Sequence, residues 1–132
     1  MSQTVLVADD EAHILHVVSM KLRNAGYEVV TAMDGEEALE LCKSDPPAVV
    51  ITDYQMPIMT GLEFCKALRA VESTRGIPAV MLTARGFDIE PAEMEEAGIE
   101  AVLAKPFSPR EILKQVQDVM ERRGAASASE SG

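Results

Sequence analysis

A short apolar run that ends in a carboxylate constrains the fold of this chain more than any other feature. Val49, Val50 and Ile51 favour a β-strand, and because the run is apolar on both faces it predicts the buried centre of a parallel sheet. Asp53 lies at the carboxyl end of this predicted strand. Ligands of open α/β sheets bind at that edge, so the other residues of interest are those that the fold would bring toward Asp53.

Strand-like runs alternate along the chain with segments of helical periodicity. We expect strands over residues 4–8, 28–32, 49–53, 77–82 and 101–104, and helices over residues 14–25, 34–44, 60–73, 91–97 and from residue 108 onward. Three of these helices start with a capping pattern, in which Asp34, Thr60 or Ser108 stands three residues before a glutamate. Five strand–helix units in series predict an α/β fold with a parallel sheet, because each right-handed crossover packs a helix back onto the sheet.

Length and composition fit one domain. The chain has 132 residues, of which 47% are hydrophobic, and this is enough for one ordinary core. We expect the domain to span residues 1–123 and residues 124–132 (GAASASESG) to form a disordered polar tail, with no effector domain after it. Cys42 and Cys65 fall on apolar faces of separate expected helices, and we interpret them as buried thiols.

The charge and hydropathy of the chain argue against two classes of partner. The formal net charge is -10, whereas a nucleic-acid-binding surface needs clustered Lys and Arg. No apolar run approaches the roughly 20 residues that span a bilayer, and the N-terminus lacks a signal-peptide pattern. We therefore expect a soluble, cytoplasmic protein that contacts neither nucleic acid nor membrane.

Five polar residues fall at the predicted carboxyl ends of four different strands. They are Asp9, Asp10, Asp53, Thr83 and Lys105. Two unit charges about 4 Å apart interact by roughly 4 kcal/mol at an effective dielectric of 20, so clustered carboxylates need a cation. Oxygen ligands favour Mg²⁺, which keeps coordination positions open for phosphate oxygens.

This set of residues suits phosphoryl transfer to a carboxylate. Such a reaction requires in-line positioning and charge neutralisation, which Mg²⁺, the Lys105 ammonium and the Thr83 hydroxyl can provide. Asp53 is then the nucleophile that forms an aspartyl-phosphate. Taken singly, the residues have ordinary alternatives: Asp9 and Asp10 would suit a helix cap, Thr83 a strand-end hydroxyl and Lys105 a solvated lysine.

From about Thr4 to Arg123 the sequence resembles the receiver domain of two-component response regulators. The resemblance is carried by short motifs after four of the strands. They are Asp9-Asp10, Asp53 with Met56-Pro57 and Gly61, Thr83-Ala84, and Lys105-Pro106-Phe107. It implies a flavodoxin-like (βα)5 fold with a sheet of order 2-1-3-4-5.

The resemblance also implies a role for each site residue. Asp53 would accept a phosphoryl group from the phosphohistidine of a sensor kinase or of a histidine phosphotransfer protein. Asp10 would bind Mg²⁺ directly, Asp9 mainly through water, and the backbone carbonyl of Gln55 would complete the protein ligands. Thr83 and Lys105 would contact the phosphoryl oxygens, and the bond between Lys105 and Pro106 would be cis. A downstream protein would read the altered surface of the fourth helix, fifth strand and fifth helix.

One position departs from the family pattern. Many members carry Tyr or Phe three residues before the lysine, and its ring turns inward when the threonine moves toward phosphate; here the residue is Val102. Valine has a restricted side chain and no ring to turn. The aromatic part of the switch is therefore in question at Val102, while the movement of Thr83 is not.

Two other functions stay open at this point. A haloacid-dehalogenase-type enzyme also uses an aspartate nucleophile and Mg²⁺, but it needs a second aspartate two residues on, where this chain has Gln55. A phosphorylation-independent adaptor with a receiver-like fold is the third reading, and Val102 is the residue that favours it.

Overall fold

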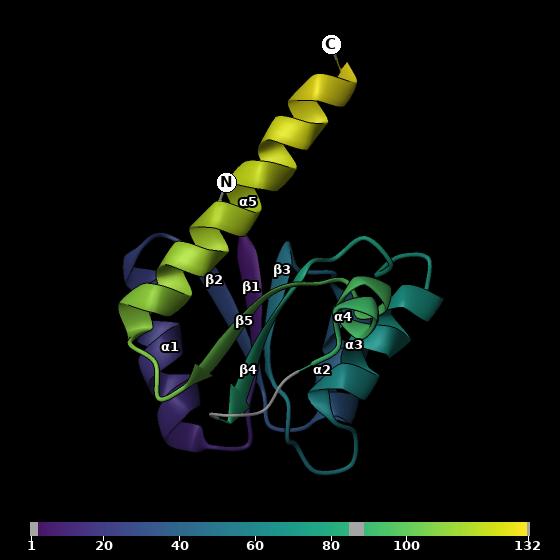
Figure 1. Ribbon diagram of the computed structural model, residues 1–132. Coiled ribbons are helices and arrows are strands. Elements are labelled where there is room, and N and C mark those ends of the chain that lie inside the picture. The colour runs from purple at the N-terminus through teal and green to yellow at the C-terminus, as the bar shows by residue number, and fades with distance from the viewer. Residues whose placement is uncertain (1–2, 85–88, 132) are drawn as a thin grey trace.

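The elements expected from the sequence are all present among the described residues, and strands alternate with helices along the chain (Figure 1). The computed structural model describes residues 3–84 and 89–131, with the backbone alone for residues 123–131. The strands are β1 (Thr4–Ala8), β2 (Glu28–Ala32), β3 (Val49–Asp53), β4 (Ala79–Ala84) and β5 (Ile99–Lys105). The helices are α1 (Ala12–Asn24), α2 (Gly35–Ser44), α3 (Gly61–Ala70), α4 (Pro91–Ala97) and α5 (Pro109–Ser131).

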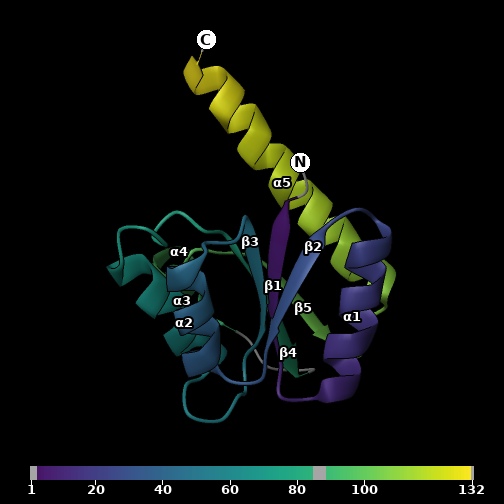
Figure 2. The ribbon, with the colours of Figure 1, turned by 180° about the vertical axis from the view of Figure 1, so that it is seen from behind.

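The described strands form one parallel sheet in the order β2-β1-β3-β4-β5. Helices α1 and α5 cover one face of this sheet, while α2, α3 and α4 cover the other (Figures 1 and 2). The predicted flavodoxin-like (βα)5 fold is therefore confirmed. In this topology β3 lies at the centre of the sheet, as its two apolar faces predicted.

The core consists of two apolar clusters, one on each face of the sheet. Val50 contributes to the cluster under α2, α3 and α4, together with Phe64 and Leu68 of α3. Its neighbour Ile51 contributes to the cluster under α1 and α5, which includes Val18. Successive residues of a strand point to opposite faces, so β3 is buried along its whole length. A strand held on both faces gives Asp53 a rigid support.

Some element boundaries differ from those expected. Strand β4 begins at Ala79 and not at residue 77, because the Ile77 N–H closes a turn on the Thr74 carbonyl at 3.1 Å and Pro78 has no N–H to donate. Helix α3 ends at Ala70, earlier than residue 73. There the Thr74 hydroxyl donates to the Leu68 carbonyl at 2.7 Å and ties the following loop to the helix end.

Helix α5 is longer than expected. It continues to Ser131, over residues for which the sequence predicted a disordered tail, and its end extends past the sheet (Figures 1 and 2). The three alanines in this segment favour a helical backbone. The domain boundary at residue 123 stays a prediction. Among the described residues, no helix combines the length and the apolar character needed to cross a bilayer.

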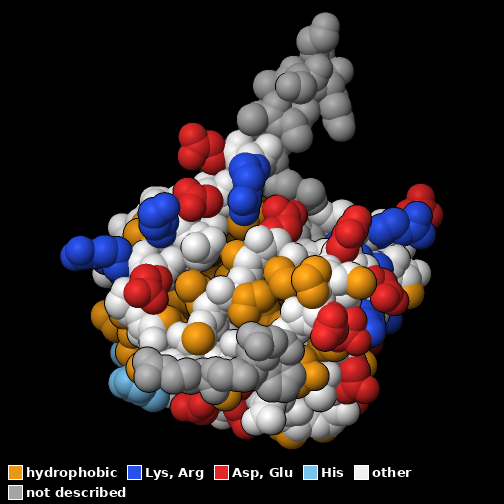
Figure 3. Space-filling view, in the orientation of Figure 1, with side chains coloured by type: hydrophobic (Ala, Val, Ile, Leu, Met, Phe, Trp, Pro, Cys, Tyr) orange, Lys and Arg blue, Asp and Glu red, His pale blue; other side chains and the backbone are white. Residues whose placement is uncertain are grey.

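One face of the molecule carries a concentration of apolar surface. In Figure 3, hydrophobic side chains gather across the middle of the face on which Figure 1 shows β5 and α4. These two elements contribute four half-buried apolar residues: Met94, Ala101, Val102 and Leu103. Strand β5 is an edge strand of the sheet. Met94 and Val102 pack against one core cluster, and Ala101 and Leu103 pack against the other.

Candidate phosphoryl acceptor site

The register of the sheet brings the carboxyl ends of its central strands level with one another. Ala8 of β1 pairs with Thr52 of β3, so Asp9 and Asp53 follow side by side. Asp53 in turn pairs with Leu82 of β4. Farther along the edge, Ala84 of β4 pairs with Lys105, the last residue of β5. Four segments that are distant in sequence therefore end at one edge.

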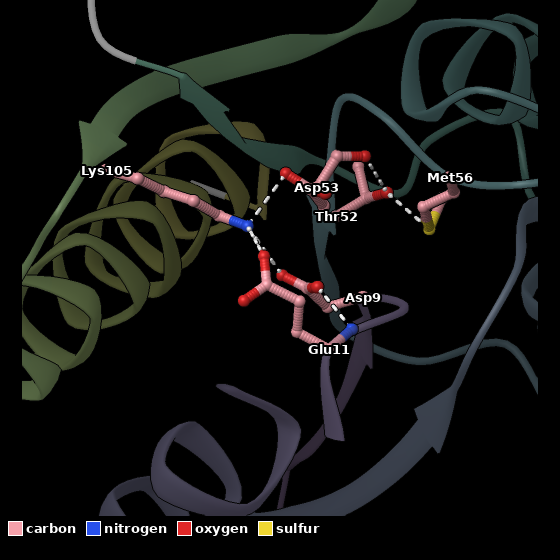
Figure 4. Close-up of polar contacts among 6 residues, drawn as sticks. All are labelled: Asp9, Glu11, Thr52, Asp53, Met56 and Lys105. Carbon is pink, nitrogen blue, oxygen red and sulfur yellow. Dashed lines mark hydrogen bonds and ion pairs between the residues drawn. The ribbon is translucent and has the colours of Figure 1, made fainter. Parts of the chain in front are cut away.

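Lys105 is the cation around which the carboxylates at this end of the sheet gather. Its Nζ lies 3.2 Å from Asp53 Oδ1, 3.2 Å from Asp9 Oδ2 and 3.2 Å from Glu11 Oε1 (Figure 4). Its side chain is 21% exposed, so solvent weakens these ion pairs only in part. Lys105 thus lies beside Asp53, and the contact of Lys105 with a phosphoryl oxygen stays a prediction. The cis peptide bond between Lys105 and Pro106 that the resemblance implied is present.

The three predicted acidic residues lie together. Asp9, Asp10 and Asp53 each place a carboxylate oxygen within 4.8 Å of those of the other two. Asp9 and Asp53 are buried and Asp10 is exposed. Oxygen donors at this spacing, with more negative than positive charge, match the preference of Mg²⁺ for carboxylate and water ligands. The donor set therefore fits the predicted metal.

Burial and the neighbouring charges shift the pKa values of these groups. Burial, and then the neighbouring Asp9 carboxylate, raise the pKa of Asp53 to about 6, although Lys105 opposes the shift. Burial also raises the pKa of Asp9, against the hydrogen bond from the Glu11 N–H and the charge of Lys105. For Lys105, burial alone would lower the pKa, but Asp9, Asp53 and Glu11 together raise it. The cluster thus carries more carboxylate charge than Lys105 neutralises.

A pocket of about 290 Å³ opens above the cluster. It is lined by Asp10, Glu11, Asp53, Tyr54, Gln55, Ala84 and Lys105. Gln55, whose backbone carbonyl the resemblance gives as a metal ligand, is among these lining residues, and its role as a ligand stays a prediction. The buried Asp9 is not among the lining residues; its carboxylate accepts a hydrogen bond from the Glu11 N–H at 2.9 Å and pairs with Lys105.

Thr83 and Val102 lie on the opposite side of the sheet from Lys105. Thr83 is the buried residue before Ala84 at the end of β4, where it pairs with Ala104. By strand alternation its side chain shares a face with Met81, which pairs with Val102. Among the described residues, Ala84 lines the pocket and Thr83 does not. The structure thus unites the acids with Lys105 and places Thr83 next to them at the same edge.

The loop after Asp53 is held at both ends. The Tyr54 N–H donates to the Leu82 carbonyl at 2.8 Å, and the Tyr54 carbonyl accepts from the Gly61 N–H at 2.8 Å. The Thr52 hydroxyl donates to the Asp53 carbonyl at 3.0 Å and lies 3.9 Å from Met56 Sδ (Figure 4). These contacts fix the backbone from which the Asp53 carboxylate projects.

Sequence reasoning missed Glu11 as part of the site. Its carboxylate is the third partner of Lys105, and its N–H is the partner of Asp9. A weak signal was available, because an acidic residue directly after Asp9 and Asp10 falls at the start of a helix where glutamate is a poor cap.

Known proteins share both the sequence pattern and the fold. Residues 5–117 match the family model of the response regulator receiver domain. The chain is 36% identical over 129 residues to the alkaline phosphatase synthesis transcriptional regulatory protein PhoP of Bacillus subtilis. The aligned region covers 98% of this chain and 53% of that protein. This chain spans about half the length of the curated relatives it matches.

Two solved structures illustrate the likeness. The chemotaxis response regulator CheY4 of Vibrio cholerae has a TM-score of 0.83 and 40% identity, over 90% of this chain and 99% of that one. The receiver domain of a sensor histidine kinase from Pseudomonas aeruginosa PAO1 has a TM-score of 0.79 and 27% identity, over 89% of this chain and 97% of that one. That domain holds a magnesium ion in its active site cleft.

Proposed function

Because the chain belongs to the family of response regulator receiver domains, we propose that Asp53 accepts a phosphoryl group in a Mg²⁺-dependent reaction. The donor is the phosphohistidine of a sensor kinase or of a histidine phosphotransfer protein. The observation that carries this proposal is the position of Asp53, which lies 3.2 Å from Lys105 and within 4.8 Å of the carboxylates of Asp9 and Asp10. The chain is then a signalling protein that catalyses only its own phosphorylation and dephosphorylation.

In the proposed reaction Asp53 acts as the nucleophile. With a pKa of about 6 its carboxylate is mostly ionised at neutral pH, and one of its oxygens bonds to phosphorus while the bond from phosphorus to the donor nitrogen breaks. Asp10, Asp53 and the Gln55 carbonyl would hold Mg²⁺, with Asp9 acting mainly through water, and the ion would supply charge neutralisation. The Lys105 ammonium turns from the carboxylates to a phosphoryl oxygen. The magnesium in the similar Pseudomonas aeruginosa domain supports this assignment.

Thr83 links the reaction to the output surface. On phosphorylation its hydroxyl would move to donate to a second phosphoryl oxygen. Strand alternation puts the Thr83 side chain on the same face as Val102. A shift of Thr83 would change the packing around Val102 and Met94, which belong to the same apolar cluster. Because Val102 has no ring to turn, the change would travel through Thr83 and the β4 backbone. A downstream protein would read it on the apolar face formed by α4 and β5 (Figure 3).

The phosphoryl donor has a surface to dock on next to the site. An apolar groove of about 550 Å³ lies between α1 and the start of α5, and its walls include Ile14, Val17 and Phe107. The groove adjoins the Asp53 pocket, since Glu11, Ala84 and Lys105 line both. We assign this groove to the donor.

A direct nucleic-acid partner remains unexpected, because the net charge of -10 would repel phosphates. We also expect a cytoplasmic location.

The proposal is tested by incubating the protein with acetyl phosphate and Mg²⁺ and following bound phosphate. We expect acid-labile, hydroxylamine-sensitive phosphate on the native chain and none on the Asp53→Asn variant. Asp45→Asn, which alters an exposed aspartate at the end of α2, is the matched control and should label normally. Labelling that persists in Asp53→Asn would exclude Asp53 as the sole acceptor.

Val102 supports a second candidate function, that of an adaptor whose partner binds regardless of phosphorylation. Without a ring at this position the output surface has fewer ways to respond. Beryllofluoride, a mimic of the phosphoryl group, separates the two candidates. An adaptor keeps the same partner affinity with and without beryllofluoride and binds Mg²⁺ only in the millimolar range or weaker. A phosphorylation-dependent regulator changes its partner affinity.

A further inference from the structure

Glu11 is the exposed member of the three carboxylates that hold Lys105. Its Oε1 lies 3.2 Å from Lys105 Nζ, as close as Asp9 and Asp53 (Figure 4). The burial of the three differs sharply, because the Glu11 side chain is 59% exposed while those of Asp9 and Asp53 are 0% and 9% exposed. Glu11 can therefore leave Lys105 by turning into solvent, which the two buried groups cannot do.

The position of Glu11 in the fold points to a role beyond helix formation. Glu11 is the N-cap residue of α1 and makes no side-chain cap hydrogen bond. In contrast, Asp34 caps α2 by accepting from the Glu37 N–H at 2.8 Å, and Thr60 caps α3 by accepting from the Glu63 N–H at 3.1 Å. A cap hydrogen bond stabilises a helix. At α1 this contribution is absent, and the carboxylate binds Lys105.

A phosphoryl group on Asp53 would compete with Glu11 for the same ammonium. The proposed reaction requires Lys105 to turn to a phosphoryl oxygen, and Glu11 already occupies one side of this ammonium. Glu11 also lines the pocket that the phosphoryl group would enter, so its charge repels the incoming anion. Both effects act in the same direction and both end when the charge is removed.

We propose that Glu11 is a positioning residue that holds Lys105 in the unphosphorylated state and lowers the affinity of the site for a phosphoryl group. This inference rests on the proposed function and adds a regulating residue to it. Glu11 sets how readily the protein leaves the unphosphorylated state. The assignments of the nucleophile and of the proposed metal ligands do not change. Removing its charge raises the affinity of the site.

The experiment measures the affinity for beryllofluoride in the presence of Mg²⁺ by NMR titration. Glu11→Gln keeps the size of the side chain, and we expect it to bind about two- to fivefold more tightly than the native chain, as the loss of one exposed ion pair predicts. Glu36→Gln removes an exposed charge from the first turn of α2 and should leave the affinity unchanged. The difference between Glu11→Gln and the native chain should shrink at 1 M salt, because exposed pairs are screened.

A second variant separates positioning from helix stability. Glu11→Asp places a good N-cap residue at the start of α1 and shortens the reach to Lys105. We expect it to have a higher thermal midpoint than Glu11→Gln but to bind beryllofluoride less tightly than Glu11→Gln, because its negative charge stays beside the pocket. In the metal-free protein, the side-chain NMR resonances of Lys105 should shift in both Glu11 variants and stay unchanged in Glu36→Gln.

The outcomes are distinct. Equal or weaker beryllofluoride binding by Glu11→Gln, or the same gain in Glu36→Gln, overturns the inference while the proposed function stands. Affinities that follow the thermal midpoints of the variants also overturn it, since they indicate a purely structural role. If neither the native chain nor any variant binds beryllofluoride with Mg²⁺, the proposed function fails and the inference fails with it.

Discussion

At the scale of single residues, Asp53 combines its proposed role as phosphoryl acceptor with a cost in stability. Burial and the Asp9 carboxylate raise its pKa from 3.8 to about 6. The folded state therefore binds the proton of this group more tightly than the unfolded state does. The stabilisation from this group is complete below pH 3.8 and is lost as the pH rises through about 6. At neutral pH the ionised carboxylate therefore opposes folding of the metal-free chain.

Asp53→Asn should consequently stabilise the metal-free protein at pH 7.5. A shift of this size corresponds to at most about 3 kcal/mol, and we expect a gain in the free energy of unfolding of about 1–3 kcal/mol. Urea denaturation in the presence of a chelator measures it, and the gain should shrink as the pH is lowered toward 4. Asp45→Asn serves as the control for an exposed carboxylate. A loss of stability in Asp53→Asn, or a gain that is independent of pH, would contradict the assigned pKa.

The residue scale also shows how far sequence alone could lead to the site. Asp9, Asp10, Asp53 and Lys105 were predictable, because each stands where an apolar strand ends and parallel strands bring their ends together. For Glu11 the sequence held only a weak signal, since the direction of a long side chain at a helix start depends on which cation the tertiary fold brings near it.

At the scale of the elements, one arginine joins α3 to α4. Arg69 Nε donates to the Ala97 carbonyl at 2.9 Å, and its other nitrogens donate to the carbonyls of Arg75 and Ile77. Gly98 follows Ala97 with a φ of 73°, and a Cβ there would lie 2.5 Å from the Arg69 guanidinium carbon. The end of α4 thus depends on the absence of a side chain at Gly98.

Gly98→Ala should therefore destabilise the fold more than Gly26→Ala. Both glycines have positive φ, but a Cβ at Gly26 meets nothing within 4 Å. We expect a loss of about 1–2 kcal/mol for Gly26→Ala from backbone strain alone, and at least about 1 kcal/mol more for Gly98→Ala from displacement of Arg69. Chemical denaturation of both variants measures the difference. Equal losses would show that Arg69 yields freely and does not fasten α4.

Element boundaries were predictable where a side chain marks them. The capping patterns at Thr60 and Ser108 form reciprocal hydrogen bonds with the glutamate three residues on. At Asp34 the side chain accepts from the Glu37 N–H, while the Glu37 carboxylate accepts from the N–H of Met33. The start of β4 was less predictable, because it depends on a turn closed by Thr74 and on pairing with a neighbouring strand. Local chemistry determines caps, whereas partners distant in sequence determine strand ends.

At the scale of the whole molecule, metal binding should stabilise the domain. The three carboxylates repel one another in the metal-free state, and a ligand that binds only the folded state adds stability in proportion to the logarithm of its concentration. We expect the thermal midpoint to rise with Mg²⁺. The free energy of unfolding should increase by about 1.4 kcal/mol for each tenfold increase in Mg²⁺ concentration above the dissociation constant.

Asp10→Asn tests whether this stabilisation comes from the acidic cluster. Because Asp10 is exposed and lines the pocket, its replacement should leave the metal-free fold intact and reduce the effect of Mg²⁺. Asp45→Asn should respond to Mg²⁺ as the native chain does. A midpoint that does not change with Mg²⁺ in the native chain would count against a metal site at Asp9, Asp10 and Asp53.

The central claim is that the sheet brings four separate segments together so that Asp53, and no other carboxylate, receives the phosphoryl group. The most direct measurement is peptide mapping by mass spectrometry after reaction with acetyl phosphate and Mg²⁺, with reductive trapping of the acyl phosphate. We predict modification of the peptide that contains Asp53, at that residue alone, and none when Mg²⁺ is chelated. Modification at Asp9, Asp10 or Glu11 instead, or a reaction that proceeds equally without Mg²⁺, would contradict the account.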